Sequence, residues 1–232
     1  MEPSSDRPSP PDPPEAALAP APVRRRRARL LQAYTLLAAL GFGALAFLAY
    51  NFGHFDLDVA VTLAVQSFRP AWFALLMRAV SFFGYNPQAW IIVAASAGLL
   101  YVLGLRWEAV VTALAGTAAG LLGALAKLVI GRPRPPEDLV EVLRDLPGFG
   151  FPSGHVVFYS GFFGFLWFLV YTLLPRGPLR SALLVLLGTL LALVGLSRVY
   201  LGVHWASDAT GGYLLGSLAL LAFIGIYRRG IT

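Results

Sequence analysis

Long apolar segments alternate with short polar segments along most of this chain. The first uncharged apolar run covers residues 30–50, and about 20 helical residues are enough to cross the hydrocarbon core of a bilayer. Similar runs recur toward the C-terminus, and the segments predicted to span a membrane are 30–50, 87–105, 108–130, 155–174, 179–196 and 208–227. The pattern predicts an all-α, polytopic membrane helical bundle of about six transmembrane helices.

One apolar stretch, residues 58–84, does not fit a single span. The pair Arg69-Pro70 and a further arginine, Arg78, interrupt it. Proline ends or kinks a helix, and a charged side chain in mid-membrane is costly. Two interpretations stay open for this stretch: interfacial helices, or an extension of the second span.

Composition agrees with a membrane protein and excludes several chemistries. Hydrophobic residues make up 57% of the chain and charged residues 13%, whereas a soluble domain carries about 25% charged residues. The chain has no cysteine. This excludes a disulfide framework, a thiolate nucleophile and a cysteine-ligated metal.

The N-terminal residues differ in composition from the rest. Eight of the 17 prolines lie within residues 1–22, and five arginines lie within residues 24–29. Such a segment buries too little apolar surface to fold. We predict a disordered, Pro-rich and Arg-rich cytoplasmic tail over residues 1–29 and one membrane-embedded domain over 30–232. The net charge of +6 could suit a nucleic acid, but arginines directly before an apolar run are typical of a membrane flank, so we expect no nucleic-acid partner.

The basic residues predict an orientation in the plasma membrane. With a cytoplasmic N-terminus, the same side also receives Arg106, Arg176, Arg180, Arg228 and Arg229. The other side receives Arg69, Arg78 and residues 131–154, and four carboxylates in this last segment offset its basic residues. The positive-inside rule therefore predicts that both termini are cytoplasmic in this multi-pass protein.

Three polar clusters interrupt the apolar sequence, at the end of the third span, the start of the fourth, and between the fifth and sixth. Their members are Lys127, Arg132 and Arg134, then Ser153, Gly154 and His155, and finally Ser197, Arg198, His204 and Asp208. All these span ends lie on one side of the bilayer, which the predicted orientation makes the extracytoplasmic side. Ionisable groups at membrane depth are functional candidates by default.

The residue types in these clusters suit a phosphate site. Lys127, Arg134 and Arg198 are cations able to bind phosphoryl oxygens. Ser153 and Gly154 stand where a helix begins, with unpaired N–H groups that favour an anion. Asp208 follows His204 by four residues, and a helix or a turn could bring that carboxylate to the imidazole. His155 is then available as a general acid.

At these residues the sequence resembles the type-2 phosphatidic acid phosphatase superfamily, which also includes vanadium-dependent haloperoxidases. The family signature has three parts: Lys, six residues and Arg-Pro; Pro-Ser-Gly-His; and Ser-Arg, five residues, His, three residues, Asp. The chain matches them at Lys127 with Arg134-Pro135, at 152–155, and at Ser197, Arg198, His204 and Asp208. The resemblance covers about residues 55–228, and it suggests a bacterial-type member.

The resemblance implies a role for each matching residue. His204 attacks phosphorus and becomes phosphohistidine, Asp208 orients it, and His155 protonates the leaving lipid oxygen. Lys127, Arg134, Ser153, Gly154 and Arg198 hold the phosphoryl oxygens. The resemblance to the phosphatases of this family implies no need for a metal, and we expect no metal or other cofactor here. Spacing from Lys127 selects Arg134 over Arg132, which we interpret as a headgroup or substrate-rim contact.

The expected function is hydrolysis of a lipid phosphate or pyrophosphate monoester. Undecaprenyl pyrophosphate, phosphatidylglycerophosphate and phosphatidate stay open as substrates, with a slight preference for a polyprenyl pyrophosphate or a broad range. A non-catalytic phospholipid carrier or scaffold is the alternative. A haloperoxidase is disfavoured because known members of that branch are soluble. The expected partners are the lipid substrate and the bilayer, and the sequence sets no oligomeric state. Gly116, Gly120 and Gly123 predict close helix packing.

Overall fold

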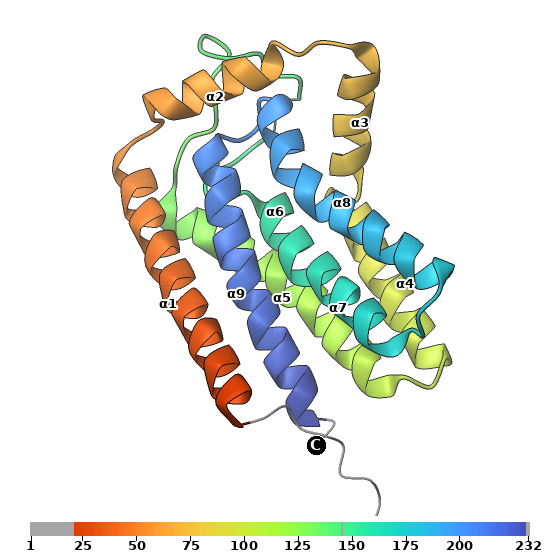
Figure 1. Ribbon diagram of the computed structural model, residues 1–232. Helices are drawn as coiled ribbons and strands as arrows, with labels where there is room; N and C mark the ends of the chain where they lie inside the picture. Colours follow the sequence, from red (N-terminus) through yellow and green to blue (C-terminus); the bar gives the residue numbers. More distant parts are fainter. Residues whose placement is uncertain (1–20, 145, 231–232) are drawn as a thin grey trace, which may run out of the picture. The chain divides into compact units, whose positions relative to one another are not determined.

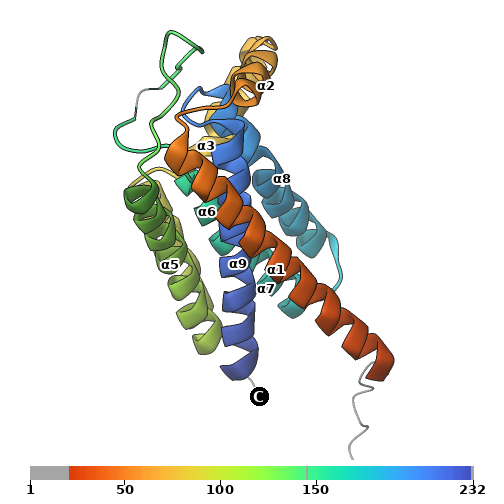
Figure 2. The same cartoon turned by 90° about the vertical axis from the view of Figure 1, so that its left-hand side faces the viewer.

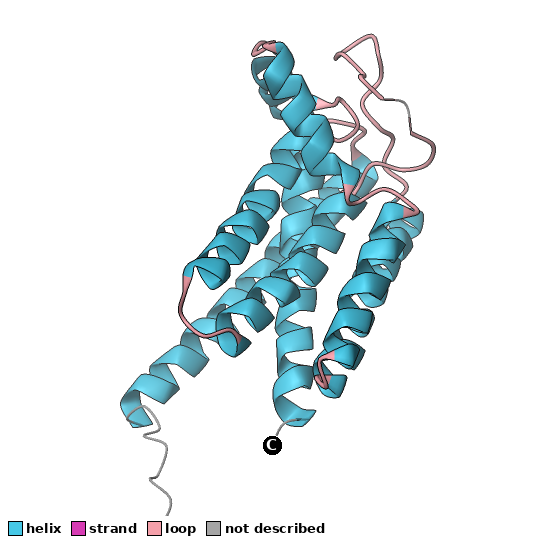
Figure 3. Cartoon of the chain, turned by 90° about the vertical axis from the view of Figure 1, so that its right-hand side faces the viewer, coloured by secondary structure: helices cyan, strands magenta, loops and turns pink. Residues whose placement is uncertain are grey.

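The computed structural model describes residues 21–144 and 146–230, and within these ranges it contains helices and loops but no strand (Figure 3). The predicted all-α class is confirmed. The chain divides into two units, one ending at Leu36 and one from Leu37 onward, and the candidate site lies wholly in the second. The helices are α1 (Ala21–Asn51), α2 (Asp56–Gln66), α3 (Ala71–Phe82), α4 (Gln88–Val102), α5 (Arg106–Ile130), α6 (Gly154–Phe158), the π-helical turn η1 (Tyr159–Phe163), α7 (Gly164–Leu173), α8 (Pro178–Tyr200) and α9 (Ala206–Gly230).

Five helical segments among the described residues are long and apolar enough to cross a membrane. They are Pro22–Asn51, Arg106–Ile130, Gly154–Leu173, Pro178–Tyr200 and Ala206–Gly230, and they correspond to five of the six predicted spans. The predicted second span is the shorter apolar helix α4. Its 15 residues extend about 22 Å, less than the ~30 Å hydrocarbon core, because each helical residue rises about 1.5 Å.

The stretch that the sequence left ambiguous forms two short helices, α2 and α3. The break between them comes at Arg69-Pro70, and Pro70 is the N-cap of α3. Proline fits there because the first turn of a helix leaves its backbone N–H unused. Of the two interpretations of residues 58–84, separate short helices describe this region.

Part of the segment predicted to be a disordered tail is helical, since α1 begins at Ala21. Residues 21–29 of that segment are therefore helical. Arginine, alanine and leucine are strong helix formers, so the apolar helix can continue through the arginine run. The prediction of disorder for residues 1–20 lies outside the described residues.

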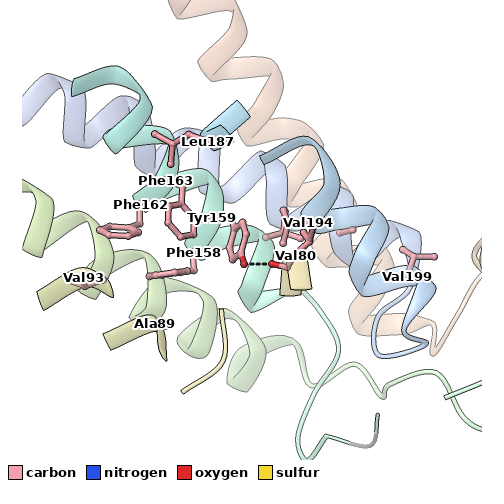
Figure 4. Close-up of a cluster of buried hydrophobic side chains, with 12 residues drawn as sticks. Val80, Ala89, Val93, Phe158, Tyr159, Phe162, Phe163, Leu187, Val194 and Val199 are labelled. Atoms are coloured by element: carbon pink, nitrogen blue, oxygen red, sulfur yellow. Dashed lines mark hydrogen bonds between the residues drawn. The ribbon is translucent and has the colours of Figure 1, made fainter. Parts of the chain in front are cut away.

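The continuous helical run α6–η1–α7 occupies the middle of the second unit and contacts α5, α8 and α9 (Figures 1 and 2). Aromatic side chains of this run, Phe158, Tyr159, Phe162 and Phe163, form much of a buried cluster (Figure 4). The Tyr159 hydroxyl donates a hydrogen bond to the carbonyl of Val80 in α3. Such a bond satisfies the polar end of a buried ring and ties α3 to the centre of the bundle.

Small residues allow α5 to approach its neighbours, as predicted, but not at all three glycines. A Cβ at Gly116 would lie 2.3 Å from the Val93 side chain, and one at Gly123 would lie 3.4 Å from the Cα atom of Gly154. A Cβ at Gly120 would meet nothing within 4 Å. The packing prediction is therefore wrong for Gly120, which lines a cavity instead.

The helix ends that carry the polar clusters lie at one end of the second unit (Figure 1). Helix α5 stops at Gly131, whose φ of 67° places it in the left-handed region that ends many helices. Residues 132–144 and 146–153, between α5 and α6, form no helix. At the same end, the short turn 201–205 connects α8 to α9.

Candidate active site

His204 lies in the turn between α8 and α9 and is almost fully buried, with 2% of its surface exposed. Its Nδ1 atom lies 3.4 Å from Oδ2 of Asp208. Since α9 begins only at Ala206, the turn brings the two side chains together, which was one of the two alternatives open from the sequence. A carboxylate facing Nδ1 holds the ring proton there and leaves the Nε2 lone pair for chemistry.

Arg134 lies on the other side of the imidazole. Its Nη1 atom is 3.3 Å from His204 Nε2 and donates a hydrogen bond of 2.8 Å to the carbonyl of Val203. Its Nε and Nη2 atoms donate to the carbonyls of Gly148 and Pro147, at 3.2 and 3.3 Å. Loop carbonyls therefore hold a guanidinium beside the nitrogen that would attack a phosphorus atom.

Lys127 reaches the same region from the last turn of α5. Its ammonium donates hydrogen bonds to the carbonyls of Phe149 and Gly150, at 2.6 and 3.0 Å. A snorkelling lysine would extend toward water or lipid headgroups. Lys127 instead binds the loop that precedes α6, where the anion-binding residues Ser153 and Gly154 were predicted.

Arg198, near the end of α8, is completely buried but only partly hydrogen-bonded. Its Nη1 atom donates to the hydroxyls of Ser81 and Tyr85, at 3.0 and 2.6 Å. Its Nε and Nη2 atoms have no hydrogen-bond partner in the described part of the chain. An unpaired buried donor costs about 1–3 kcal/mol, and more when it is charged. The unpaired edge of this guanidinium is therefore suited to an anion.

Two further buried polar atoms next to the start of α6 have no partner among residues 21–144 and 146–230. They are Oγ of Ser153 and Nε2 of His155. The His155 ring packs edge-on against Tyr85, with ring centroids 4.5 Å apart. Its Nε2 atom is thus available to exchange a proton with a ligand rather than being tied to a protein acceptor.

A cavity of about 260 Å³ joins most of these residues. Six of the eight predicted site residues line it: Lys127, Arg134, Gly154, His155, Arg198 and His204. The other two lie directly behind this lining. Ser153 precedes Gly154 and donates its N–H to the backbone carbonyl of Asp208, at 3.0 Å. The structure therefore brings together the residues that the three motifs selected.

The electrostatic surroundings keep the imidazole of His204 neutral. Burial is the largest effect and lowers the pKa of His204 well below its usual 6.5, and the charges of Lys127, Arg198 and Arg134 lower the pKa further. Neutral imidazole is the form that can act as a nucleophile. The cations that would bind a phosphate thus also favour the reactive form of His204.

The interpretation of Arg132 as a headgroup or rim contact is wrong. Arg132 is 1% exposed and forms ion pairs with Asp58 and Asp208. Arg134, two positions further along the chain, lines the cavity. Arg132 instead points into the protein, toward the two buried carboxylates.

Sequence reasoning also missed Asp58, Ser81 and Tyr85. Asp58 is an ionisable residue in an apolar stretch, and that signal alone could have marked it as a candidate. Ser81 and Tyr85 carried no comparable signal, because single hydroxyls are common. Within the described ranges, no group of three or more histidine, aspartate or glutamate side chains is placed to hold a metal ion.

Comparison with known proteins gives related sequences. The chain matches the PAP2 superfamily over residues 104–231. It is 30% identical over 174 residues to phosphatidylglycerophosphatase B of Bacillus subtilis, which covers 74% of this chain and 84% of that protein. It is 32% identical over 164 residues to a decaprenylphosphoryl-5-phosphoribose phosphatase of Mycobacterium tuberculosis, with 69% and 85% covered.

Solved structures show the same arrangement of helices. The crystal structure of a transmembrane PAP2 type phosphatidylglycerolphosphate phosphatase from Bacillus subtilis matches with a TM-score of 0.71 and 25% identity, over 84% of this chain and 96% of that one. Aquifex aeolicus LpxE matches with a TM-score of 0.60 over 75% of this chain and 98% of its own. At 19% identity, the second likeness concerns the fold alone.

Proposed function

Because the chain belongs to the PAP2 superfamily and is a membrane phosphatase acting on lipid phosphate esters, we propose that it works through a phosphohistidine formed on His204. The family predicted from the three motifs is confirmed. The observation that carries the mechanism is the unpaired edge of Arg198 in the cavity that also contains His204. That cavity offers a charged binding site for the phosphoryl group next to a neutral nucleophile.

In the first step, Nε2 of His204 attacks phosphorus as the bond to the lipid oxygen breaks. His155 gives its Nε2 proton to the departing oxygen, so the lipid leaves as an alcohol or a lower phosphate. Asp208 stabilises the positive charge that develops on the imidazole. Lys127, Arg134 and Arg198 bind the phosphoryl oxygens, with the N–H and hydroxyl groups at Ser153 and Gly154 beside them.

In the second step, His155 accepts a proton from water, whose oxygen attacks the phosphohistidine. The phosphorus–nitrogen bond breaks and inorganic phosphate leaves, which returns both histidines to their starting forms. The position of Arg134 supports this scheme. Its Nη1 atom is 3.3 Å from the attacking nitrogen, so the guanidinium would contact an oxygen of the phosphoryl group in both steps.

A second cavity supports a lipid rather than a water-soluble substrate. It has a volume of about 320 Å³, shares Lys127, Gly154 and His155 with the phosphate cavity, and extends between α4 and α5. Its remaining lining is mostly apolar: Ala89, Trp90, Gly116, Gly120, Leu121, Ala124 and Phe158. We assign the first carbons of the lipid chain to this space, because it is continuous with the site where the phosphate would be held.

The substrate itself stays within the classes predicted from the sequence. Undecaprenyl pyrophosphate, phosphatidylglycerophosphate and phosphatidate all carry a terminal phosphate on a lipid. The names of the relatives from Bacillus subtilis and Mycobacterium tuberculosis describe phosphatases of lipids that bear such a group. They favour an enzyme that removes a terminal phosphate from a lipid headgroup.

The charge distribution supports an extracytoplasmic site. Arg106, Arg176, Arg180, Arg228 and Arg229 lie at or next to the helix ends far from the site. Basic residues favour the cytoplasmic side of a membrane. We therefore propose that the phosphate site faces the outside of the plasma membrane and that the C-terminus is cytoplasmic.

The decisive experiment assays the purified chain in detergent, without added metal, against a panel of lipid monophosphates and pyrophosphates. His204→Ala should reduce phosphate release by at least about 10³-fold, as for loss of a nucleophile in other hydrolases. His54→Ala is the matched control, because His54 is exposed and lines neither cavity. Vanadate should inhibit the wild-type protein. Turnover that survives in His204→Ala contradicts the mechanism, and a folded wild-type chain that releases no phosphate from any lipid favours a carrier.

A further inference from the structure

A buried ion network lies behind His204, on the side away from the phosphate cavity. Arg132 forms two short ion pairs, from Nη1 to Oδ1 of Asp208 at 2.6 Å and from Nη2 to Oδ2 of Asp58 at 2.8 Å. All three side chains are at most 4% exposed. The network thus connects α2, the loop after α5 and the first turns of α9.

The guanidinium of Arg132 has almost no unused donor. Besides the two carboxylates, Nη1 donates to Oγ of Ser207 at 2.7 Å, and Nε donates to the carbonyl of Gly53 at 3.1 Å. Four of the five N–H groups of an arginine can be accounted for in this way. Arg132 is therefore bound to the protein and is not placed to take an oxygen of the substrate.

Asp58 does more than neutralise Arg132. Its Oδ1 atom accepts the backbone N–H of Ser207 at 2.9 Å, and its Oδ2 atom accepts the Ser207 hydroxyl at 2.7 Å. Ser207 is the second residue of α9, where a helix has unused N–H groups. A carboxylate from α2 therefore caps the helix that carries Asp208.

The two oxygens of Asp208 have separate partners. Oδ1 accepts from Arg132, whereas Oδ2 accepts the backbone N–H of Trp205 at 3.0 Å and faces the imidazole of His204. This division leaves the carboxylate little freedom to rotate. The orientation of the nucleophile thus depends on contacts that never touch the phosphate.

We propose that Asp58 and Arg132 are a positioning pair for the nucleophile: Arg132 fixes the carboxylate of Asp208, and Asp58 shares the positive charge of Arg132. This inference rests on the proposed role of His204. Arg132 paired with Asp208 alone would form a neutral ion pair. With Asp58 present, two carboxylates share one guanidinium, and the group keeps one net negative charge. That charge stabilises the cationic imidazole that forms when His204 attacks.

The test compares two aspartates of α2. Asp58→Asn keeps the shape of the side chain and an acceptor for Arg132 but removes the negative charge. We expect kcat to fall on the order of tenfold, the scale seen when a partner that orients a functional side chain is lost. KM and the inhibition constant of vanadate should change less than twofold, since the phosphate-binding groups are untouched. Asp56→Asn, the same change at an exposed position of the same helix, should behave as wild type.

Each outcome decides the proposal. Asp58→Asn with wild-type kcat and only a lower melting temperature overturns it, because the network would then be structural. A parallel loss of vanadate affinity also overturns it, since the phosphate site would be disturbed. If Asp58→Asn does not fold, Ser207→Ala carries the test: it retains all three charges and should lower kcat severalfold at unchanged vanadate affinity.

The same experiments distinguish a wrong mechanism from a wrong positioning role. If wild-type protein releases no phosphate, or His204→Ala retains turnover, the mechanism itself is wrong. If both behave as expected while Asp58→Asn and Ser207→Ala match wild type in kcat, only the positioning role is lost.

Discussion

Arg132 and Arg198 are both buried arginines close to the same catalytic centre, yet their surroundings differ. Arg132 is 1% exposed and has acceptors for four N–H groups, including two carboxylates. Arg198 is 0% exposed, contacts two hydroxyls and no carboxylate, and has two nitrogen atoms without a partner within the described residues. The two arginines are equally buried, but they differ in how many of their N–H donors have a hydrogen-bond acceptor.

This difference indicates what each arginine does. A buried charge is tolerated when it is paired and hydrogen-bonded. Arg132 meets that condition with the protein alone, so its charge serves the fold and the orientation of Asp208. Arg198 meets the condition only when a ligand anion completes its hydrogen bonds. The same substitution at both positions should therefore affect different properties.

Arg132→Gln should give the largest loss of stability. The change strands two buried carboxylates, and removing one partner of a buried ion pair costs about 3–5 kcal/mol. Thermal unfolding of the purified protein in detergent measures the effect. A melting temperature within a few degrees of wild type would show that Asp58 and Asp208 find other partners, and would weaken the contrast between the two arginines.

Arg198→Gln should instead reduce activity. Loss of a preorganised donor at a developing charge costs about 10²–10³-fold in kcat, and vanadate inhibition should weaken with it. The melting temperature without ligand should be equal to or above that of wild type, because two unpaired charged donors are removed. A drop in stability as large as that of Arg132→Gln would show that Arg198 is also a structural cation.

The sequence was a better guide to the residues that line the candidate phosphate site than to the ion network and the helix packing around them. Motif spacing selected Lys127, Arg134 and Arg198, since six residues separate Lys127 from Arg134-Pro135 and five separate Ser197-Arg198 from His204. The parity of the spans then put those span ends on the same side of the bilayer. Both inferences are local or follow from a simple count, so they needed no knowledge of side-chain partners.

The ion network could not be read in this way. Asp58 and Arg132 are 74 residues apart, and hydropathy does not say which buried carboxylate meets which guanidinium. The packing prediction for Gly120 was wrong for a related reason. Glycine spacing indicates that one side of a helix has no bulky side chains, but not whether a neighbouring helix packs against it. Helix α4 was predicted too long because residues 103–105 are as apolar as the helix before them.

The open space at Gly120 gives a smaller, selective effect. Gly120→Trp should fill the cavity between α4 and α5, keep the first carbons of a lipid chain out, and displace the headgroup. Misplacement of a substrate by about 1 Å can cost up to a hundredfold, and we expect kcat/KM for long-chain lipid phosphates to fall by about tenfold. A short-chain phosphate, which needs no such space, should be hydrolysed as by wild type.

Gly98→Trp is the matched control for that substitution. Gly98 lies on α4, a Cβ there would meet nothing within 4 Å, and the residue lines neither cavity. The Gly98→Trp variant should have the wild-type kcat/KM for both long-chain and short-chain lipid phosphates. If Gly120→Trp slows both substrates equally, the cavity does not hold the lipid chain, and the chain enters by another side of the site.

The smallest expected effect is a change in how stability depends on pH. The folded-state pKa of His204 is lowered, so below about pH 6.5 the unfolded chain binds a proton that the folded chain does not. Stability is therefore lost as pH falls from 6.5 toward the lowered pKa, by at most about 1.4 kcal/mol per pH unit. The groups around this imidazole are Lys127, Arg134, Arg198, His155 and Asp208, and they remain in the variant His204→Asn.

Comparing the melting temperatures of wild type and His204→Asn between pH 7 and 5 measures how much the protonation of His204 contributes to the loss of stability. Both proteins should lose stability on acidification, and His204→Asn should lose less, because asparagine does not titrate. Equal slopes would mean that the imidazole takes up its proton at the same pH in the folded and the unfolded chain. The cations of the phosphate site would then fail to keep His204 neutral, and the difference between the satisfied Arg132 and the unsatisfied Arg198 would have no consequence for the nucleophile.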